Sequence, residues 1–184
     1  VPAHSDAMGI ALSSMCAAPI LRWGKQAMAD CEAHKVTPEL TEIIEAIIIS
    51  TGYVSNFVQV DYTTGMAHAM YNGFTILPST EEHHHLHGEV VSYGILVMLT
   101  ADKQYAERDR LLAFNRSIGL PTHLADIHAR PEDLPAVTEK ARRLSATCKS
   151  SITPTSCSPS GTGIPEARIS LSLIHISEPT RRRG

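Results

Sequence analysis

The 184-residue chain is long enough for one ordinary domain with a real core, and 43% of its residues are hydrophobic, as in globular proteins. Its formal net charge of −3 offers no general electrostatic reason to expect a nucleic-acid partner. The longest apolar run, residues 93–99, is far shorter than the roughly 20 residues of a membrane-spanning helix.

The first third of the chain predicts two helical stretches. The first runs over residues 5–33, after a serine that can cap it, with Pro19 as an expected kink. The second begins at Thr37-Pro38-Glu39, where a hydroxyl cap precedes a proline and an acid. Apolar residues then recur at helical spacing over residues 40–48, so we expect a mostly buried helix that ends near Gly52.

The middle of the chain predicts further helices and no strands, which makes the fold class an all-α helical bundle. The longest of them is apolar nearly all round over residues 90–99 and should be central. Gly94 within it suggests that something packs against its backbone, and so does Gly88 near its start. A helix before Gly119 should end there with a glycine cap. These helices are expected over residues 65–74, 85–103, 107–118 and 131–146.

The composition changes abruptly after residue 147. Serine, threonine, proline and glycine dominate from there, without apolar periodicity. Residues 171–184 resemble the translation of a transposase adapter used in sequencing libraries. We therefore expect a helical metal-binding domain over residues 1–147, followed by a disordered and non-native tail over residues 148–184.

His68 and His87 are the candidate metal ligands. Five of the ten histidines lie between residues 65 and 100, and these two stand 19 positions apart on consecutive predicted helices. Imidazoles carried on facing helices commonly hold a divalent metal. The spacing alone also fits two buried or interfacial histidines that are satisfied by hydrogen bonds.

The other polar residues in this region are less specific. The histidine run at residues 83–85 is expected to point to solvent. Glu89 lies on the same predicted helix as His87, and it is either solvated or hydrogen-bonds a metal-bound histidine. His123 and His128 fit no pattern typical of a site.

Two motifs carry a resemblance to a known family. Residues 65–74 match a small-residue-rich helix that ends His-x-x-His-Asn-Gly, and residues 87–89 match a His-Gly-Glu that opens a long apolar helix. A later Gly-Leu-Pro-Thr is matched at residues 119–122, and the helix start at residues 36–40 fits as well. Over about residues 9–146, the chain resembles the C-terminal helical domain of the glycerol dehydrogenase branch of the iron-containing (metal-dependent) alcohol dehydrogenases.

The resemblance implies an NAD(P)-dependent alcohol dehydrogenase in which His68 and His87 hold a catalytic Zn²⁺ or Fe²⁺, and hydride passes from the alcohol to nicotinamide. Tyr71 replaces the second histidine of the family motif, which points to other polyols or to 2-hydroxy acids. Tyr71 and Phe74 would line the site. Asp6 does not match the family's third ligand, an aspartate in Gly-x-Gly-Asp, and no nucleotide-binding domain is recognisable here. We therefore expect a fragment that is inactive alone.

The expected partner is a small alcohol, polyol or hydroxy acid, and the full-length enzyme is expected to form a homo-oligomer. No nucleic-acid or membrane partner is expected. The four cysteines show neither paired nor metal-type spacing, so reduced thiols and a cytoplasmic location are expected. Three alternatives stay open: a 2-hydroxycarboxylate dehydrogenase (2-oxo acid reductase) of the same family, an all-α metallohydrolase, and a non-enzymatic helical metal-binding module. The metallohydrolase would need more carboxylate ligands than Glu81, Glu82 and Glu89 offer.

Overall fold

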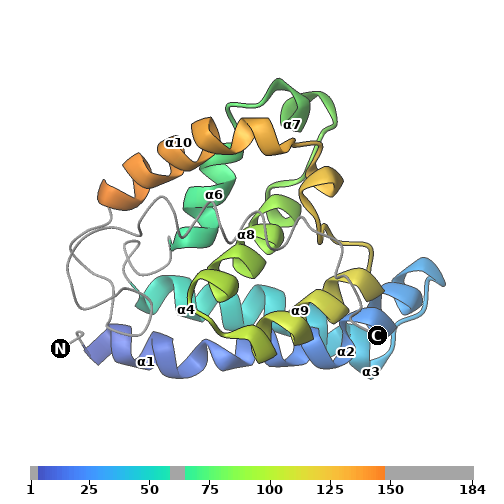
Figure 1. The fold of residues 1–184 in the computed structure, drawn as a ribbon. Coiled ribbons are helices and arrows are strands. Elements are labelled where there is room, and N and C mark those ends of the chain that lie inside the picture. The colour runs from blue at the N-terminus through green and yellow to red at the C-terminus, as the bar shows by residue number, and fades with distance from the viewer. Residues whose placement is uncertain (1–3, 59–64, 148–184) are drawn as a thin grey trace. The chain divides into compact units, whose positions relative to one another are not determined.

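The computed structural model describes residues 4–58 and 65–147 of the chain (Figure 1). Within these two ranges the secondary structure is helical and contains no strand, which confirms the all-α class. The chain divides into two compact units, residues 1–63 and residues 64–184, which we call unit 1 and unit 2. The domain predicted over residues 1–147 spans both units, and the predicted tail at 148–184 lies outside the described residues.

Unit 1 begins with two helices where one kinked helix was predicted. The break lies at Ser13, whose hydroxyl donates a hydrogen bond to the carbonyl of Ile10 at 2.7 Å. Pro19 lies inside the second of these helices and does not end it, although it removes one helical hydrogen bond. The helices of unit 1 are α1 (His4–Leu12), α2 (Ser14–Glu32), α3 (Pro38–Glu45), the π-helical turn η1 (Ala46–Ser50) and α4 (Thr51–Phe57).

A buried carboxylate closes the turn between α2 and α3. Asp30 is only 7% exposed and accepts hydrogen bonds from Gln26 Nε2 at 2.8 Å and from Thr37 Oγ1 at 2.6 Å. The same Thr37 oxygen accepts from the backbone N–H of Leu40 at 3.2 Å, which satisfies one of the free amides at the start of α3. The helix start predicted at Thr37 is therefore confirmed, and Asp30 is an unpredicted partner of that cap.

The predicted burial of the helix over residues 40–48 is wrong, and so is its predicted end at Gly52. Ile47 is 56% exposed and Ile48 is 66% exposed, and the helix continues through Gly52 to Phe57. The exposure begins before the π-helical turn η1, because Ile44 on α3 is already 47% exposed. A unit of this size also has little core in which to bury every apolar residue.

In unit 2, α6 packs against α8 on one side and α10 on another (Figure 1). Its core is formed by fully buried side chains from all three helices and from a short turn, and α8 is central, as predicted. The segments of unit 2 are α6 (Met66–Phe74), α7 (Pro78–Glu82), α8 (His87–Ala101), α9 (Tyr105–Ser117), the 3-10 turns η2 (Leu124–Ile127) and η3 (Pro131–Asp133), and α10 (Leu134–Thr147). The core side chains with no exposed surface are Met70, Phe74, Val90, Tyr93, Leu96, Val97, Ile127 and Val137.

The remaining predictions for unit 2 hold with small changes. Gly119 has a φ of +75°, the left-handed conformation that glycine adopts without strain, and it follows α9 as the predicted cap. The backbone N–H of Leu120 then donates to the carbonyl of Asn115 at 2.9 Å. The turn predicted after α6 is instead the short helix α7. No described helix combines the length and the apolar character that a membrane crossing requires.

We predict that acid weakens unit 1 through Asp30. Hydrogen bonds from Thr37 and then Gln26 hold the pKa of Asp30 below its usual value of 3.8. A group whose pKa is lowered by folding stabilises the fold above its unfolded pKa, and that contribution is lost as the pH falls through the folded value. Asp30→Asn should therefore lower the thermal midpoint at neutral pH and flatten its decline below about pH 4.

Thermal unfolding followed by circular dichroism checks this prediction. Glu42→Gln, on the exposed side of α3, is the matched control, and it should keep the wild-type pH profile. An Asp30→Asn profile that runs parallel to the wild type down to the lowest pH would contradict the assignment.

Candidate metal centre

The candidate centre depends on an unusually close approach of α6 to α8. A Cβ atom built on Gly94 of α8 would lie 2.7 Å from the carbonyl oxygen of Ala67 on α6, and 3.0 Å from its Cα. The prediction that glycine at 94 reflects packing against the backbone is confirmed. It is wrong for Gly88, because a Cβ there would have nothing within 4 Å. Ala67 directly precedes His68, so this contact brings the first candidate ligand close to α8.

His68 and His87 lie together at this helix pair. Their ring centroids are 5.4 Å apart and their planes are inclined by 43°. His68 is half-buried on α6, whereas His87 is exposed in the first turn of α8. Two nitrogens that each lie about 2.0–2.1 Å from one tetrahedral ion are separated by about 3–4 Å, a distance that rings at this spacing can reach. That these two histidines bind a metal stays a prediction.

Tyr71 completes the arrangement around His87. It lies three residues beyond His68 on α6, so both side chains share one face of that helix. The Tyr71 and His87 rings have centroids 4.2 Å apart and meet edge to face at 67°. His87 is thus flanked by a histidine and a tyrosine from α6. Phe74, which was also expected to line the site, instead lies fully buried in the core against Tyr93.

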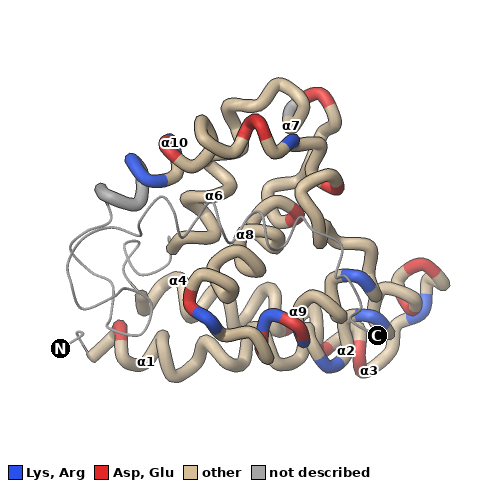
Figure 2. Tube along the Cα trace, viewed as in Figure 1, with Lys and Arg blue, Asp and Glu red and all other residues tan. Residues whose placement is uncertain are grey.

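The surroundings of His68 favour its neutral imidazole. Burial, and then the proximity of His87, lower the pKa of His68 below its usual value of 6.5. The ring is therefore neutral at pH 7, which is the form that binds a metal. Figure 2 shows that α6 carries no charged residue, and Glu89 is the sole charged residue of α8. The helices thus place two imidazole rings side by side, away from any lysine or arginine of α6 or α8.

The two histidines fit a divalent ion but do not complete its coordination. In the described part of the chain, no three His, Cys, Asp or Glu side chains already converge on one ion position. An ion held by His68 and His87 would need further ligands, such as water, a substrate oxygen, or a residue from outside the described ranges.

The prediction that residues 83–85 point to solvent is wrong for His85. Its side chain is only 10% exposed, and its Nε2 lies 2.7 Å from Nδ1 of His128. On its other side, His85 Nδ1 lies 3.4 Å from Oε2 of Glu89. The ring of His83 stacks on that of His128 with centroids 3.6 Å apart. Sequence analysis could not have found His128, because its partners lie more than 40 positions away on another segment.

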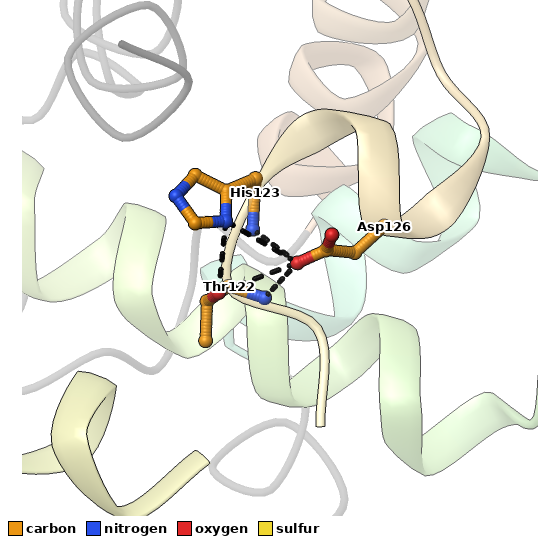
Figure 3. Close-up of polar contacts among 3 residues, drawn as sticks. All are labelled: Thr122, His123 and Asp126. Atoms are coloured by element: carbon orange, nitrogen blue, oxygen red, sulfur yellow. Dashed lines mark hydrogen bonds and ion pairs between the residues drawn. The ribbon is translucent and has the colours of Figure 1, made fainter. Parts of the chain in front are cut away.

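A second polar group surrounds the start of η2 (Figure 3). Asp126 Oδ2 accepts hydrogen bonds from the backbone N–H groups of Thr122 at 2.8 Å and His123 at 2.9 Å. The hydroxyl of Thr122 lies 2.9 Å from His123 Nδ1, and that same nitrogen lies 3.4 Å from Asp126. A catalytic relay uses both ring nitrogens of its histidine, so this group caps a turn and is no triad.

Comparison with known proteins gives relatives with named activities, whereas no protein-family profile matches the chain. The chain is 35% identical over 131 residues to the glycerol dehydrogenase of Escherichia coli O6:H1. The aligned stretch covers 69% of this chain and 33% of that protein. It is 33% identical over 108 residues to hydroxycarboxylate dehydrogenase A of Escherichia coli K12, with 59% of this chain and 29% of the relative covered.

A solved structure is similar as well. The crystal structure of a probable glycerol dehydrogenase from Sinorhizobium meliloti 1021 aligns with a TM-score of 0.75 at 27% identity, and covers 93% of this chain and 46% of that one. The chain thus spans about a third of the length of the two curated relatives and less than half of the solved chain.

We predict that Gly94→Ala destabilises unit 2 although alanine favours helices. The added Cβ would meet the backbone of Ala67, and such overpacking typically costs about 1–3 kcal/mol. Gly88→Ala on the same helix is the matched control, because its Cβ enters open space and should gain up to about 1 kcal/mol. Chemical denaturation of both variants measures the difference. Equal free energies of unfolding for the two would contradict the close helix contact.

Proposed function

We propose that this chain belongs to the glycerol dehydrogenase family and is the metal-binding helical part of an NAD(P)-dependent dehydrogenase. The reaction would transfer hydride between the CH–OH group of a small alcohol or polyol and nicotinamide. The observation that carries the proposal is the meeting of His68 and His87 from two different helices, with ring centroids 5.4 Å apart. Because the chain spans only part of its relatives, the activity is proposed for the whole parent protein.

His68 and His87 would hold a Zn²⁺ or Fe²⁺ ion through one ring nitrogen each. A bound divalent ion would supply Lewis-acid polarisation of the substrate hydroxyl, which makes its proton easier to remove. Within this chain, the contact between Ala67 and Gly94 keeps the two histidine-bearing helices in register. No lysine or arginine of α6 or α8 competes with the ion for a negatively charged substrate oxygen.

Tyr71 would act as a positioning residue for His87. Its ring contacts the His87 ring edge to face, on the same helix face as His68. His87 is exposed and lies in the first turn of α8, where a side chain without neighbours would sample several rotamers. The contact with Tyr71 restricts the ring and would therefore lower the entropy lost when an ion binds.

A specific feature favours a 2-hydroxy acid as the second candidate substrate class. A cavity of about 470 Å³ lies beside Tyr71, and Thr75 and His85 are among the residues that line it. Lys140 Nζ donates to Thr75 Oγ1 at 3.0 Å, which places an ammonium group near that wall. A substrate carboxylate that reaches this cavity would find a cationic partner there. The similarity to hydroxycarboxylate dehydrogenase A agrees with this candidate.

We predict that His87→Gln in the parent protein lowers dehydrogenase activity by about 100-fold or more, and that metal content falls with it, because a ligand is lost. The assay offers glycerol, other diols and 2-hydroxy acids with NAD and with NADP. His4→Gln, exposed at the start of α1, is the control and should leave both readouts unchanged.

Full metal content and activity in His87→Gln would refute the proposed role of this residue. Lys140→Met separates the two substrate classes, because it should raise KM for 2-hydroxy acids and leave KM for polyols unchanged. Equal effects on both substrate classes would contradict the carboxylate-binding role of Lys140.

A further inference from the structure

We propose that His83, His85 and His128 form a second metal site on unit 2, a ligand set separate from His68 and His87, and that it binds Zn²⁺. His83 and His85 lie in the loop between α7 and α8, and His128 directly follows η2. Their rings contact one another, with centroid distances of 3.6 Å for His83 and His128, 5.0 Å for His85 and His128, and 6.4 Å for His83 and His85.

Two of the donor atoms already face each other. His85 Nε2 and His128 Nδ1 are 2.7 Å apart, so one nitrogen carries a hydrogen that the other accepts. Two nitrogens bound to one tetrahedral ion at about 2.0–2.1 Å are about 3.3 Å apart. The pair therefore needs to open by only about 0.6 Å to place an ion where the shared hydrogen now lies, which a small rotation of either ring provides.

Glu89 orients His85 for this role. Its Oε2 accepts a hydrogen bond from the backbone N–H of Leu86 at 3.1 Å and lies 3.4 Å from His85 Nδ1. A carboxylate at Nδ1 favours the tautomer with the hydrogen on that nitrogen, which leaves the Nε2 lone pair directed at His128. Histidines that bind metals commonly donate their other N–H group to a carboxylate in this way.

His83 supplies the third ring. It is exposed and stacks flat on His128 with an interplanar angle of 12°, so it must turn about its own side-chain bonds before it can coordinate the same ion. A cavity of about 500 Å³ beside His83 and His128 leaves room for that rotation and for a water ligand. Glu82, Asp133 and Arg130 line the same cavity, and the two acids outnumber the single cation there.

The backbone of His128 adopts a conformation that does not require an imidazole. Its φ of +55° lies in the left-handed region, where a residue with a Cβ atom costs roughly 1–2 kcal/mol and glycine costs nothing. The turn itself does not need an imidazole, since the backbone N–H of His128 already bonds to the carbonyl of Ala125 at 3.0 Å. His84 has a similar φ of +53°, so it is the ring contacts with His83 and His85 that distinguish His128.

The donor set suits Zn²⁺, because the site offers three imidazole rings and no sulfur. The test uses the 184-residue chain with both His68→Ala and His87→Ala, so that the first pair cannot bind. Titration calorimetry with Zn²⁺ should then give about one equivalent of bound ion per chain. Zn²⁺ binding by this variant tests the second site alone, whereas the metal content and activity of the parent protein test the proposed function.

Adding His128→Gly to that chain should weaken Zn²⁺ binding by at least about tenfold. It should leave the thermal midpoint unchanged or raise it, because glycine relieves the left-handed strain. His83→Gln should weaken Zn²⁺ binding too. The control is His84→Gln at the exposed neighbouring position, and this variant should bind Zn²⁺ as tightly as its parent. The proposal is overturned if the chain lacking His68 and His87 binds no Zn²⁺, or if His128→Gly and His83→Gln bind it as tightly as their parent.

Discussion

The backbone contact between α6 and α8 is the constraint on which the candidate site depends. Only a glycine at position 94 lets the carbonyl of Ala67 approach so closely, because a Cβ would come within 2.7 Å of that oxygen. A matching contact joins α6 to α10, where a Cβ on Gly73 would lie 2.7 Å from the carbonyl of Val137. Small residues on both sides of α6 therefore hold it between two neighbours, and His68 lies within this tightly packed segment.

Burial of the apolar core offsets the free-energy cost of this close helix packing. Met70, Phe74 and Tyr93 have no exposed surface, and burial of a large apolar side chain stabilises a fold by roughly 1.5–3 kcal/mol. Those contacts lie on the inner faces of α6 and α8, whereas the histidines lie toward their less buried sides. The site can therefore hold a half-buried and an exposed imidazole at short range without relying on them for the stability of unit 2.

The sequence predicted what depends on local rules. Thr37 as a helix cap, Gly119 as a left-handed helix end and α8 as the central helix all follow from residue type and periodicity, and the structure confirms them. The importance of Gly94 was also predictable, because glycine inside an apolar helix is costly without a packing reason. The proximity of His68 and His87 was expected from the resemblance to a family with both motifs. Their spacing in the sequence alone did not predict it.

The features that could not be predicted from the sequence depend on tertiary contacts or on the size of the core. Ile44, Ile47 and Ile48 follow helical spacing, yet they are 47%, 56% and 66% exposed, because periodicity does not show how much core a small unit offers. His85 and His128 meet although 43 residues separate them, so no local pattern could predict their contact. The same limit applies to Asp30, whose partner Thr37 belongs to the next helix.

The most direct test of the central claim is anomalous diffraction from crystals of the metal-loaded parent protein, recorded at the absorption edge of the bound ion. The account predicts an anomalous peak between α6 and α8, with one ring nitrogen of His68 and one of His87 each about 2.0–2.1 Å from it. A resident metal located elsewhere, with neither histidine among its ligands, would contradict it.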